Sequence, residues 1–141
     1  MTRFVADEAA TRAFGAELGA LLKAGDVVFL SGELGAGKTT LVRGLLEGLG
    51  WRGAVRSPTF TLIQTYPTEP PILHTDLYRV TSWEGLGLED SMEDHVLLVE
   101  WPDRAEGLVR DGEAWRVQID FSGNGRVITA TRPNSELPLP A

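Results

Sequence analysis

The amino-acid sequence predicts an α/β fold: a single three-layer domain with a mostly parallel central sheet and a C-terminal antiparallel hairpin. Three observations lead to this fold. Short continuous apolar runs at 27–30 and 96–100 are typical of strands that are buried on both faces of a parallel sheet. Two segments with apolar residues at helical spacing flank the first run. Near the C-terminus, residues 114–132 alternate with a period of two around a Gly-Asn-Gly turn.

The N-terminal half reads as helix, strand, glycine-rich loop and helix. Residues 7–23 have helical spacing, and Gly25 can end that helix in a left-handed conformation. The strand at 27–30 is followed at once by a run of glycines. Residues 38–49 then repeat leucine every fourth position, which predicts the second helix.

The C-terminal half is predicted to be mainly strands. Residues 60–66 are rich in β-branched and aromatic residues, and the runs at 71–76 and 96–100 end in Asp76 and Glu100. Acids at the ends of buried strands lie where α/β proteins bind their ligands. The hairpin is expected from strands at 114–121 and 126–132.

Length and composition limit the protein to one ordinary globular domain. The 141 residues have room for a single core, which we expect within residues 1–132, and residues 133–141 are expected to form a disordered tail. A net charge of −7 argues against a protein that grips nucleic acid by itself. The chain has no cysteine, so disulfides and thiolate metal sites are excluded. Without a signal peptide or a membrane-length apolar run, we expect a cytoplasmic protein that makes no membrane contact.

Residues 32–39, Gly-Glu-Leu-Gly-Ala-Gly-Lys-Thr, match the phosphate-binding pattern GxxxxGK[ST] in full. They lie between a predicted buried strand and a predicted helix, which is the context that this loop requires. Glycines let successive backbone N–H groups face phosphate oxygens, and the N-terminus of the helix adds positive potential. The sequence therefore predicts a P-loop NTPase.

The pattern assigns chemistry to individual residues of the loop. Lys38 is expected to neutralise the β- and γ-phosphates, and the Thr39 hydroxyl to bind Mg²⁺. No Asn-Lys-x-Asp guanine-binding motif is present, which favours ATP as the nucleotide. The expected nucleotide contacts within this pattern are Glu33, Leu34, Gly35, Ala36, Gly37, Lys38 and Thr39.

A P-loop enzyme also needs acids near the phosphates. Glu100 is the better candidate for the magnesium acid, because four apolar residues precede it and indicate a central strand. Asp76 could orient or deprotonate the attacking water. For both, the alternative is an acid that merely leaves the core at a strand end. The predicted catalytic residues are thus Asp76, Lys38 and Glu100.

Four segments together resemble the TsaE family of bacterial tRNA threonylcarbamoyladenosine biosynthesis proteins. They are residues 32–40, Ser-Pro-Thr-Phe-Thr-Leu at 57–62, His-Thr-Asp-Leu-Tyr-Arg at 74–79 and Val-Glu-Trp-Pro at 99–102. Their order and spacing follow the family. The resemblance implies an ATPase that binds the TsaB–TsaD protein pair and supports threonylcarbamoyl transfer to the adenosine beside the anticodon of tRNAs reading ANN codons. It implies contact with tRNA only through that complex.

The resemblance also assigns residues. Lys38 matches the phosphate lysine, Thr39 the magnesium hydroxyl and Glu100 the magnesium acid, while Thr40 matches a second hydroxyl of the loop and is added to the nucleotide contacts. Asp76 matches the acid of the HxDLYR motif. The segment 57–59 resembles a switch that senses the γ-phosphate.

Some interpretations remain open at this point. On the residues alone, His74 is more simply a hydrogen-bonded core histidine than a catalytic base, and Trp101 a packing anchor. The acidic stretch 84–94 is either a solvated surface or a docking surface for a basic partner. A small-molecule P-loop kinase is the alternative enzyme, and a nucleotide-dependent binding module without useful hydrolysis is a third interpretation.

Overall fold

The computed structural model describes residues 1–33, 35–58, 62–78, 80, 83–110 and 112–134. Several residues of the sequence-based predictions therefore lie outside the described residues. They are Leu34 in the phosphate loop, Thr59 in the predicted switch, residues 60 and 61 of the predicted strand, Arg79 at the end of the 74–79 segment, and residues 135–141 of the predicted tail.

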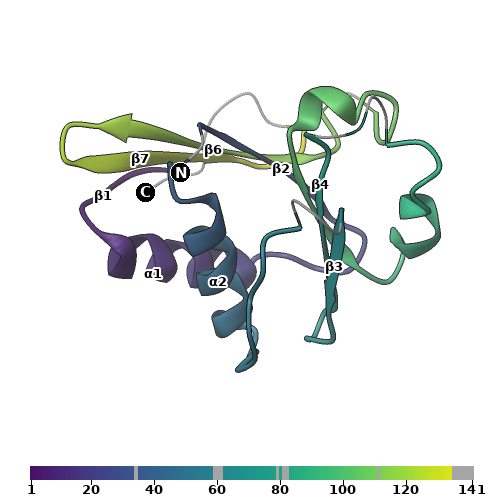
Figure 1. Ribbon diagram of the computed structural model, residues 1–141, viewed down its shortest axis with the longest axis horizontal. Helices are drawn as coiled ribbons and strands as arrows, with labels where there is room; N and C mark the ends of the chain where they lie inside the picture. Colours follow the sequence, from purple (N-terminus) through teal and green to yellow (C-terminus); the bar gives the residue numbers. More distant parts are fainter. Residues whose placement is uncertain (34, 59–61, 79, 81–82, 111, 135–141) are drawn as a thin grey trace.

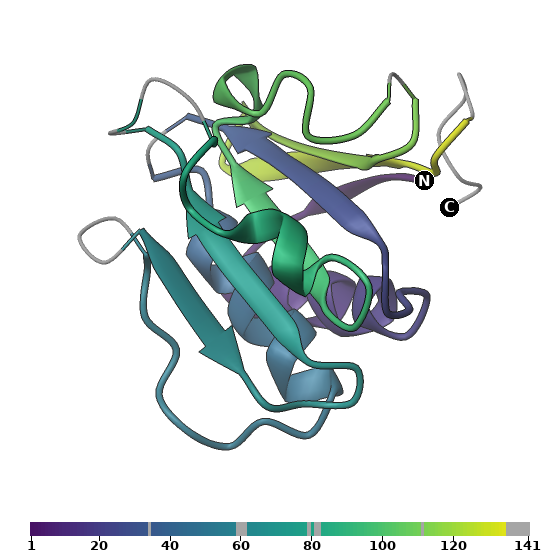
Figure 2. The same ribbon diagram turned by 90° about the vertical axis from the view of Figure 1, so that its right-hand side faces the viewer.

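Within the described residues, seven strands form one sheet in the order β1-β7-β6-β2-β5-β4-β3. Their bounds are β1 Thr2–Val5, β2 Val27–Gly32, β3 Ile63–Tyr66, β4 Ile72–Asp76, β5 Val96–Glu100, β6 Trp115–Ser122 and β7 Gly125–Thr131. The four central strands β6, β2, β5 and β4 are parallel, and antiparallel strands complete both edges. Figure 2 shows β3 running against its neighbour β4. The predicted α/β fold, with a mostly parallel sheet and a C-terminal hairpin, is confirmed.

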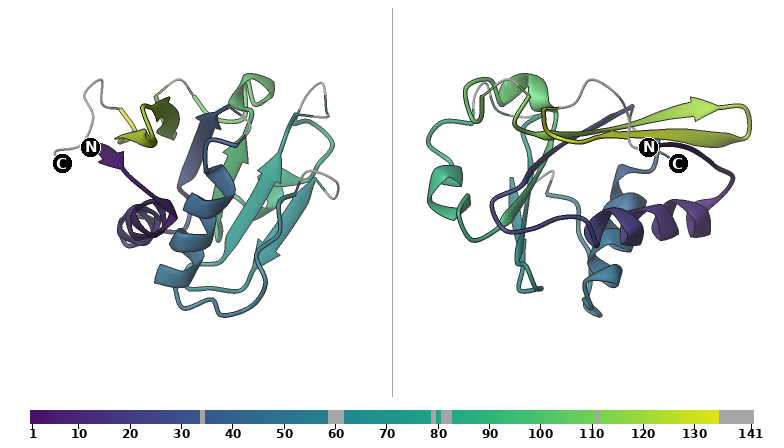
Figure 3. Two further views of the ribbon diagram at one scale, coloured as in Figure 1. Left: turned by 60° about the vertical axis from the view of Figure 1, so that its left-hand side comes forward. Right: turned by 180° about the vertical axis from the view of Figure 1, so that it is seen from behind.

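Two α-helices cover one face of this sheet (Figures 1 and 3). They are α1, Glu8–Gly19, and α2, Lys38–Gly48. Asp7 caps α1, since its side chain accepts a hydrogen bond from Ala10 N at 2.9 Å. Glycines bring the two helices into close contact: a Cβ at Gly15 would overlap the backbone of α2, and one at Gly44 would overlap the backbone of Arg12 in α1. The larger core lies between these helices and the sheet.

The opposite face of the central strands is covered by loops with two short 3₁₀ turns, η1 Leu88–Ser91 and η2 Pro102–Arg104. This third layer encloses a second, smaller core around Leu77, Leu88 and Leu97, all fully buried. Leu88 anchors the acidic stretch, whereas the neighbouring Glu89 and Asp90 side chains are exposed. The third layer is therefore held by a few leucines and not by α-helices.

The strand β1 is an element that the sequence did not predict. It adds to the hairpin edge by pairing with β7, and it places the start of α1 beside the turn of that hairpin. The first helix is also shorter than expected and ends at Gly19, because residues 20–22 tighten into turns. Among the described residues, no helix has the length and apolar character needed to cross a membrane.

Candidate functional site

The site forms where parallel strands end. The carboxyl ends of β2, β4 and β5 meet at one edge of the sheet, with β2 leading into the glycine-rich loop and β4 and β5 ending in Asp76 and Glu100. This is the edge at which α/β folds bind ligands. Side chains far apart in the sequence are thus brought together by strand order.

The glycine-rich loop delivers an uncapped helix N-terminus to this edge. Gly37 precedes α2 with φ 115°, a conformation that favours glycine, and no side chain caps the helix. The first turn of α2 has no acidic residue. A Cβ at Gly35, φ 80°, would meet only open space, so the loop is open on that side. Backbone N–H groups at such an N-terminus suit a phosphate group.

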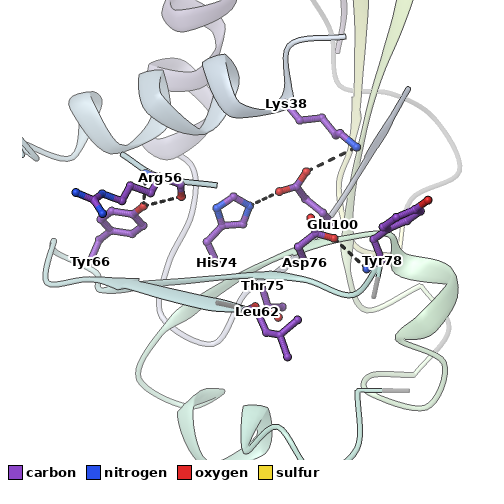
Figure 4. Close-up of polar contacts among 9 residues, drawn as sticks. All are labelled: Lys38, Arg56, Leu62, Tyr66, His74, Thr75, Asp76, Tyr78 and Glu100. Atoms are coloured by element: carbon purple, nitrogen blue, oxygen red, sulfur yellow. Dashed lines mark hydrogen bonds and ion pairs between the residues drawn. The ribbon is translucent and has the colours of Figure 1, made fainter. Parts of the chain in front are cut away.

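Lys38, Glu100 and His74 form a buried polar chain beside the loop (Figure 4). Lys38 Nζ lies 3.7 Å from Glu100 Oε1, and His74 Nε2 lies 2.7 Å from Glu100 Oε2. The residues are 8%, 5% and 1% exposed, respectively. Burial of a lysine and a glutamate is tolerated only when the charges are paired, as they are here.

Burial raises the pKa of Glu100, but the hydrogen bond with His74 and the charge of Lys38 outweigh this effect. The pKa of Glu100 is therefore held below its ordinary value, and its carboxylate is ionised at neutral pH. An ionised carboxylate beside the phosphate lysine is what a magnesium acid requires.

Asp76 lies next to Glu100 across the sheet, since the two residues are register partners of β4 and β5. Its side chain is buried, and Oδ1 accepts a hydrogen bond from Tyr78 N at 2.9 Å. The strand end is also tied to the preceding segment: Asp76 N donates to Leu62 O at 3.2 Å, and Thr75 Oγ1 donates to the same oxygen at 2.7 Å. The Asp76 carboxylate is thus held by Tyr78 N, and the strand end that carries it is held by Leu62 O.

One pocket, of about 260 Å³, contains most of the predicted site. It is lined by Gly35, Gly37, Lys38, Thr39, Thr40, Ser57, Asp76, Glu100 and Trp101. The structure therefore brings together Lys38, Thr39, Asp76 and Glu100, the residues predicted to act on phosphate, metal and water. Ser57, the first residue of the predicted switch segment, also lies at this pocket.

Two of the predicted nucleotide contacts lie outside this pocket. Glu33 lines an adjoining space of about 430 Å³ that shares Lys38 and Trp101 with the first. Ala36 is buried and lines a third pocket, which shares Gly35, Gly37 and Thr40 with the first. Their predicted contacts would come from the backbone of the loop, which is consistent with both positions.

Trp101 forms a wall of the site. It has φ 60° and ψ 60°, in the left-handed region that is uncommon for residues other than glycine. Its ring packs on Tyr78 with centroids 4.6 Å apart, and Lys38 Nζ lies 5.1 Å from the ring centroid. The packing role predicted for Trp101 is present, and it places the ring against Lys38.

The sequence did not identify Arg126, a residue near the start of β7 that is hydrogen-bonded to the glycine-rich loop. Arg126 Nε donates to Ala36 O at 3.1 Å, and Nη2 lies 3.4 Å from Gly35 O. Together with the start of α1, it borders a pocket of about 220 Å³ beside Thr40. No motif marks Arg126, because its role depends on the hairpin folding back over the loop.

The donors at the site fit Mg²⁺ held jointly with a nucleotide. Thr39 and Glu100 present hydroxyl and carboxylate oxygens, the hard donors that Mg²⁺ prefers. Across the described part of the chain, no group of three or more His, Cys, Asp or Glu residues is placed to hold a metal ion. A magnesium ion here would complete its coordination with phosphate oxygens and water.

Comparison with known proteins identifies the family. The sequence model of the threonylcarbamoyl adenosine biosynthesis protein TsaE matches residues 5–128. The chain is 50% identical over 117 residues to the tRNA threonylcarbamoyladenosine biosynthesis protein TsaE of Streptomyces coelicolor, covering 77% of this chain and 78% of that protein. It is 36% identical over 138 residues to the protein of the same name from Haemophilus influenzae, covering 91% and 87%.

A solved structure agrees with these sequence matches. The crystal structure of YdiB from Bacillus subtilis superimposes with a TM-score of 0.82 and 34% identity, covering 95% of this chain and 86% of that one. The family match spans every segment on which the resemblance rested. The chain belongs to the TsaE family, which acts in tRNA threonylcarbamoyladenosine biosynthesis.

Proposed function

We propose that this protein is an ATPase that binds the TsaB–TsaD pair and hydrolyses ATP in support of threonylcarbamoyl transfer to the adenosine beside the anticodon of tRNAs reading ANN codons. The observation that carries the proposal is the convergence of Lys38, Thr39, Asp76 and Glu100 on one pocket at an uncapped helix N-terminus. Family membership supplies the biological setting. The reaction would take place in the cytoplasm, where tRNA is modified, and tRNA would be met only through the protein pair.

Phosphate binding follows from the loop and Lys38. Backbone N–H groups of residues 33–38 and the N-terminus of α2 would face the phosphate oxygens, and Lys38 would neutralise the β- and γ-phosphates. Lys38 is already held near this position by Glu100 Oε1 and by the Trp101 ring. Less side-chain entropy is then lost when the nucleotide binds.

Magnesium would be held by Thr39 and Glu100 together with the nucleotide. When bound, the ion supplies positive charge to the β- and γ-phosphate oxygens. Glu100 is suited to this role because its low pKa keeps it ionised. In this proposal the protein contributes two magnesium ligands, Thr39 and Glu100, and the nucleotide supplies others, so metal and nucleotide would bind cooperatively.

Asp76 would act on the attacking water. It accepts a proton as the water oxygen bonds to the γ-phosphorus and the bond to the β–γ bridging oxygen breaks, which gives ADP and inorganic phosphate. Its hydrogen bond from Tyr78 N fixes the carboxylate for this task. Leu62 O is bonded to the same strand end, and loss of the γ-phosphate would be sensed at the predicted switch segment that begins at Ser57.

The nucleoside part would occupy the pocket between α1 and the hairpin turn. This pocket borders Thr40 and Arg126, and Glu100 lines the neighbouring pocket instead. Nucleoside and γ-phosphate must lie on opposite sides of the loop, because the phosphate chain runs between them. Among the described lining residues, the Thr11 and Thr40 hydroxyls and the Arg126 guanidinium offer polar contacts to a ribose or base.

The proposal is tested by measuring ATP hydrolysis by the purified protein, alone and with the TsaB–TsaD pair and tRNA. Lys38→Ala serves as the blank. We expect slow turnover alone, since no arginine is among the described residues that line the site, and stimulation by the pair that the Lys38 variant lacks. Absence of stimulation, with ADP formed only when a small acceptor is added, would instead make the protein a small-molecule kinase. Nucleotide binding without any turnover would make it a binding module.

A further inference from the structure

We propose that His74 is a positioning residue for Glu100: it holds one carboxylate oxygen so that the other is presented to the magnesium position beside Lys38. This inference rests on the proposed function, because it takes Glu100 to be the magnesium acid. It goes beyond that function by giving a role to a buried side chain that the chemistry above does not use.

The register of the sheet places the imidazole directly beside the carboxylate. His74 and Asp76 are two residues apart on β4 and therefore point to the same face, which is also the face of Glu100 because Asp76 and Glu100 are register partners. His74 Nε2 lies 2.7 Å from Glu100 Oε2. Figure 4 shows the Glu100 carboxylate between the His74 ring and the Lys38 amine.

The two oxygens of Glu100 have different partners. Oε2 is within hydrogen-bond distance of His74, whereas Oε1 is 3.7 Å from Lys38 Nζ, longer than a normal hydrogen bond. Oε1 is thus the oxygen that remains available at the pocket. Without a partner on Oε2, a glutamate with three rotatable side-chain bonds would lose this orientation.

The side chain of His74 makes no other polar contact among the described residues. Its Nδ1 is buried without a hydrogen-bond partner, so its polar interactions are confined to Glu100. With the hydrogen on Nε2, the ring donates its one N–H to the carboxylate. A leucine of similar volume would fill the same space without leaving a buried nitrogen unsatisfied, so packing alone does not account for an imidazole here.

Partners that orient a metal ligand contribute measurably to metal affinity. Magnesium is expected to tighten the binding of a non-hydrolysable ATP analogue. We therefore expect His74→Leu to raise the magnesium concentration that gives half of this effect, by about 10- to 100-fold. Binding of the analogue in EDTA should be unchanged, because Lys38 and the loop are intact. His74→Gln should restore most of the magnesium effect, since its amide nitrogen reaches about as far as Nε2 and can donate to Oε2.

The experiment measures analogue binding by calorimetry over a range of MgCl₂ concentrations, which needs no turnover. Leu73→Val is the matched control: it perturbs the same strand on the opposite face, within the smaller core, and should leave the magnesium dependence as in wild type. If His74→Leu does not fold, His74→Asn takes its place, because its shorter amide cannot reach Glu100.

Each outcome decides the proposal. The proposal is supported if the Leu or Asn variant needs more magnesium for tight binding of the analogue and the Gln variant recovers the wild-type requirement. The proposal is overturned if the Leu or Asn variant keeps the wild-type magnesium dependence. It is also overturned if the Gln variant is as impaired as the others, since the effect would then come from the changed shape of the side chain and not from the lost hydrogen bond. If wild type itself binds the analogue without regard to magnesium, the metal role of Glu100 in the proposed function fails as well. If only the His74 variants contradict the expectation, the proposed function stands.

Discussion

Asp76 and Glu100 are register partners on adjacent parallel strands, so two carboxylates leave the same edge of the sheet side by side. Their surroundings differ. Glu100 lies between His74 and Lys38, whereas Asp76 is held by the N–H of Tyr78. Two neighbouring acids in different environments can take separate roles in one reaction.

Separate roles predict separable kinetic effects. Asp76→Asn should lower the rate of partner-stimulated hydrolysis by about 10²- to 10⁴-fold, the usual contribution of a general base, with little change in binding of ATP with magnesium. Glu100→Gln should instead raise the magnesium requirement. Steady-state rates measured over a magnesium titration distinguish the two. Unchanged stimulated hydrolysis in Asp76→Asn would remove Asp76 from the mechanism.

The low pKa of Glu100 predicts a dependence of stability on pH. A carboxyl group whose pKa is lower in the folded than in the unfolded state contributes stability that is complete above its unfolded pKa of about 4.3, and that is lost as the pH falls through the folded pKa. Wild type should therefore exceed Glu100→Gln in free energy of unfolding at neutral pH, and the difference should shrink below about pH 4.3. Urea unfolding of both proteins at a series of pH values measures it. A difference that grows on acidification would contradict the assigned direction.

The close crossing of α1 and α2 predicts a large cost for one added methyl group. A Cβ at Gly44 would overlap the backbone of Arg12, which cannot move as a flexible side chain could. Gly44→Ala should therefore lower the free energy of unfolding by about 1–3 kcal/mol or more, despite the better helix propensity of alanine.

Gly19→Ala is the matched control for this substitution. Its Cβ would lie 3.1 Å from Leu45 O, so a shift of a few tenths of an ångström accommodates it. Thermal and urea unfolding should show a clearly smaller loss for Gly19→Ala. Equal losses would mean that the helices separate as readily at Gly44 as at Gly19.

The bracing of the phosphate loop by Arg126 predicts a nucleotide-affinity effect from the C-terminal hairpin. Arg126→Met removes the contacts with Ala36 O and Gly35 O but keeps a long apolar side chain over the Phe121 ring. We expect about 10- to 150-fold weaker nucleotide binding, as for the loss of a hydrogen bond from a charged donor. Calorimetric titration with ADP and magnesium measures it.

Arg132→Met provides the control for this prediction. Arg132 follows β7 at the opposite end from the turn, with its guanidinium 5.4 Å from the Trp115 ring, and it does not line the pocket beside Thr40. It should leave the affinity unchanged. If both substitutions weaken nucleotide binding equally, the cause would be the net charge of the hairpin and not the hydrogen bonds between Arg126 and the loop.

Local sequence patterns sufficed for the elements that carry the motifs. The strand Val96–Glu100 and the start of α2 at Lys38 match their predicted positions, because an uninterrupted apolar run and a glycine followed by regular leucines are local features. The strand Thr2–Val5 was not predicted. It is short and half exposed, and it exists because β7 offers it an edge to pair with, which no local pattern records.

In the candidate site, too, some features follow from local sequence and others only from tertiary structure. The spacing of Gly32 to Thr39 predicts a phosphate loop by itself, since backbone geometry and helix polarity act over a few residues. The sequence also indicated Asp76 and Glu100 as strand-end acids, but only the parallel order of β2, β5 and β4 makes them neighbours of Lys38. The contacts of His74 with Glu100 and of Arg126 with the loop join residues 26 and 90 positions apart. They depend on register and on the return of the hairpin, so tertiary structure alone decides them.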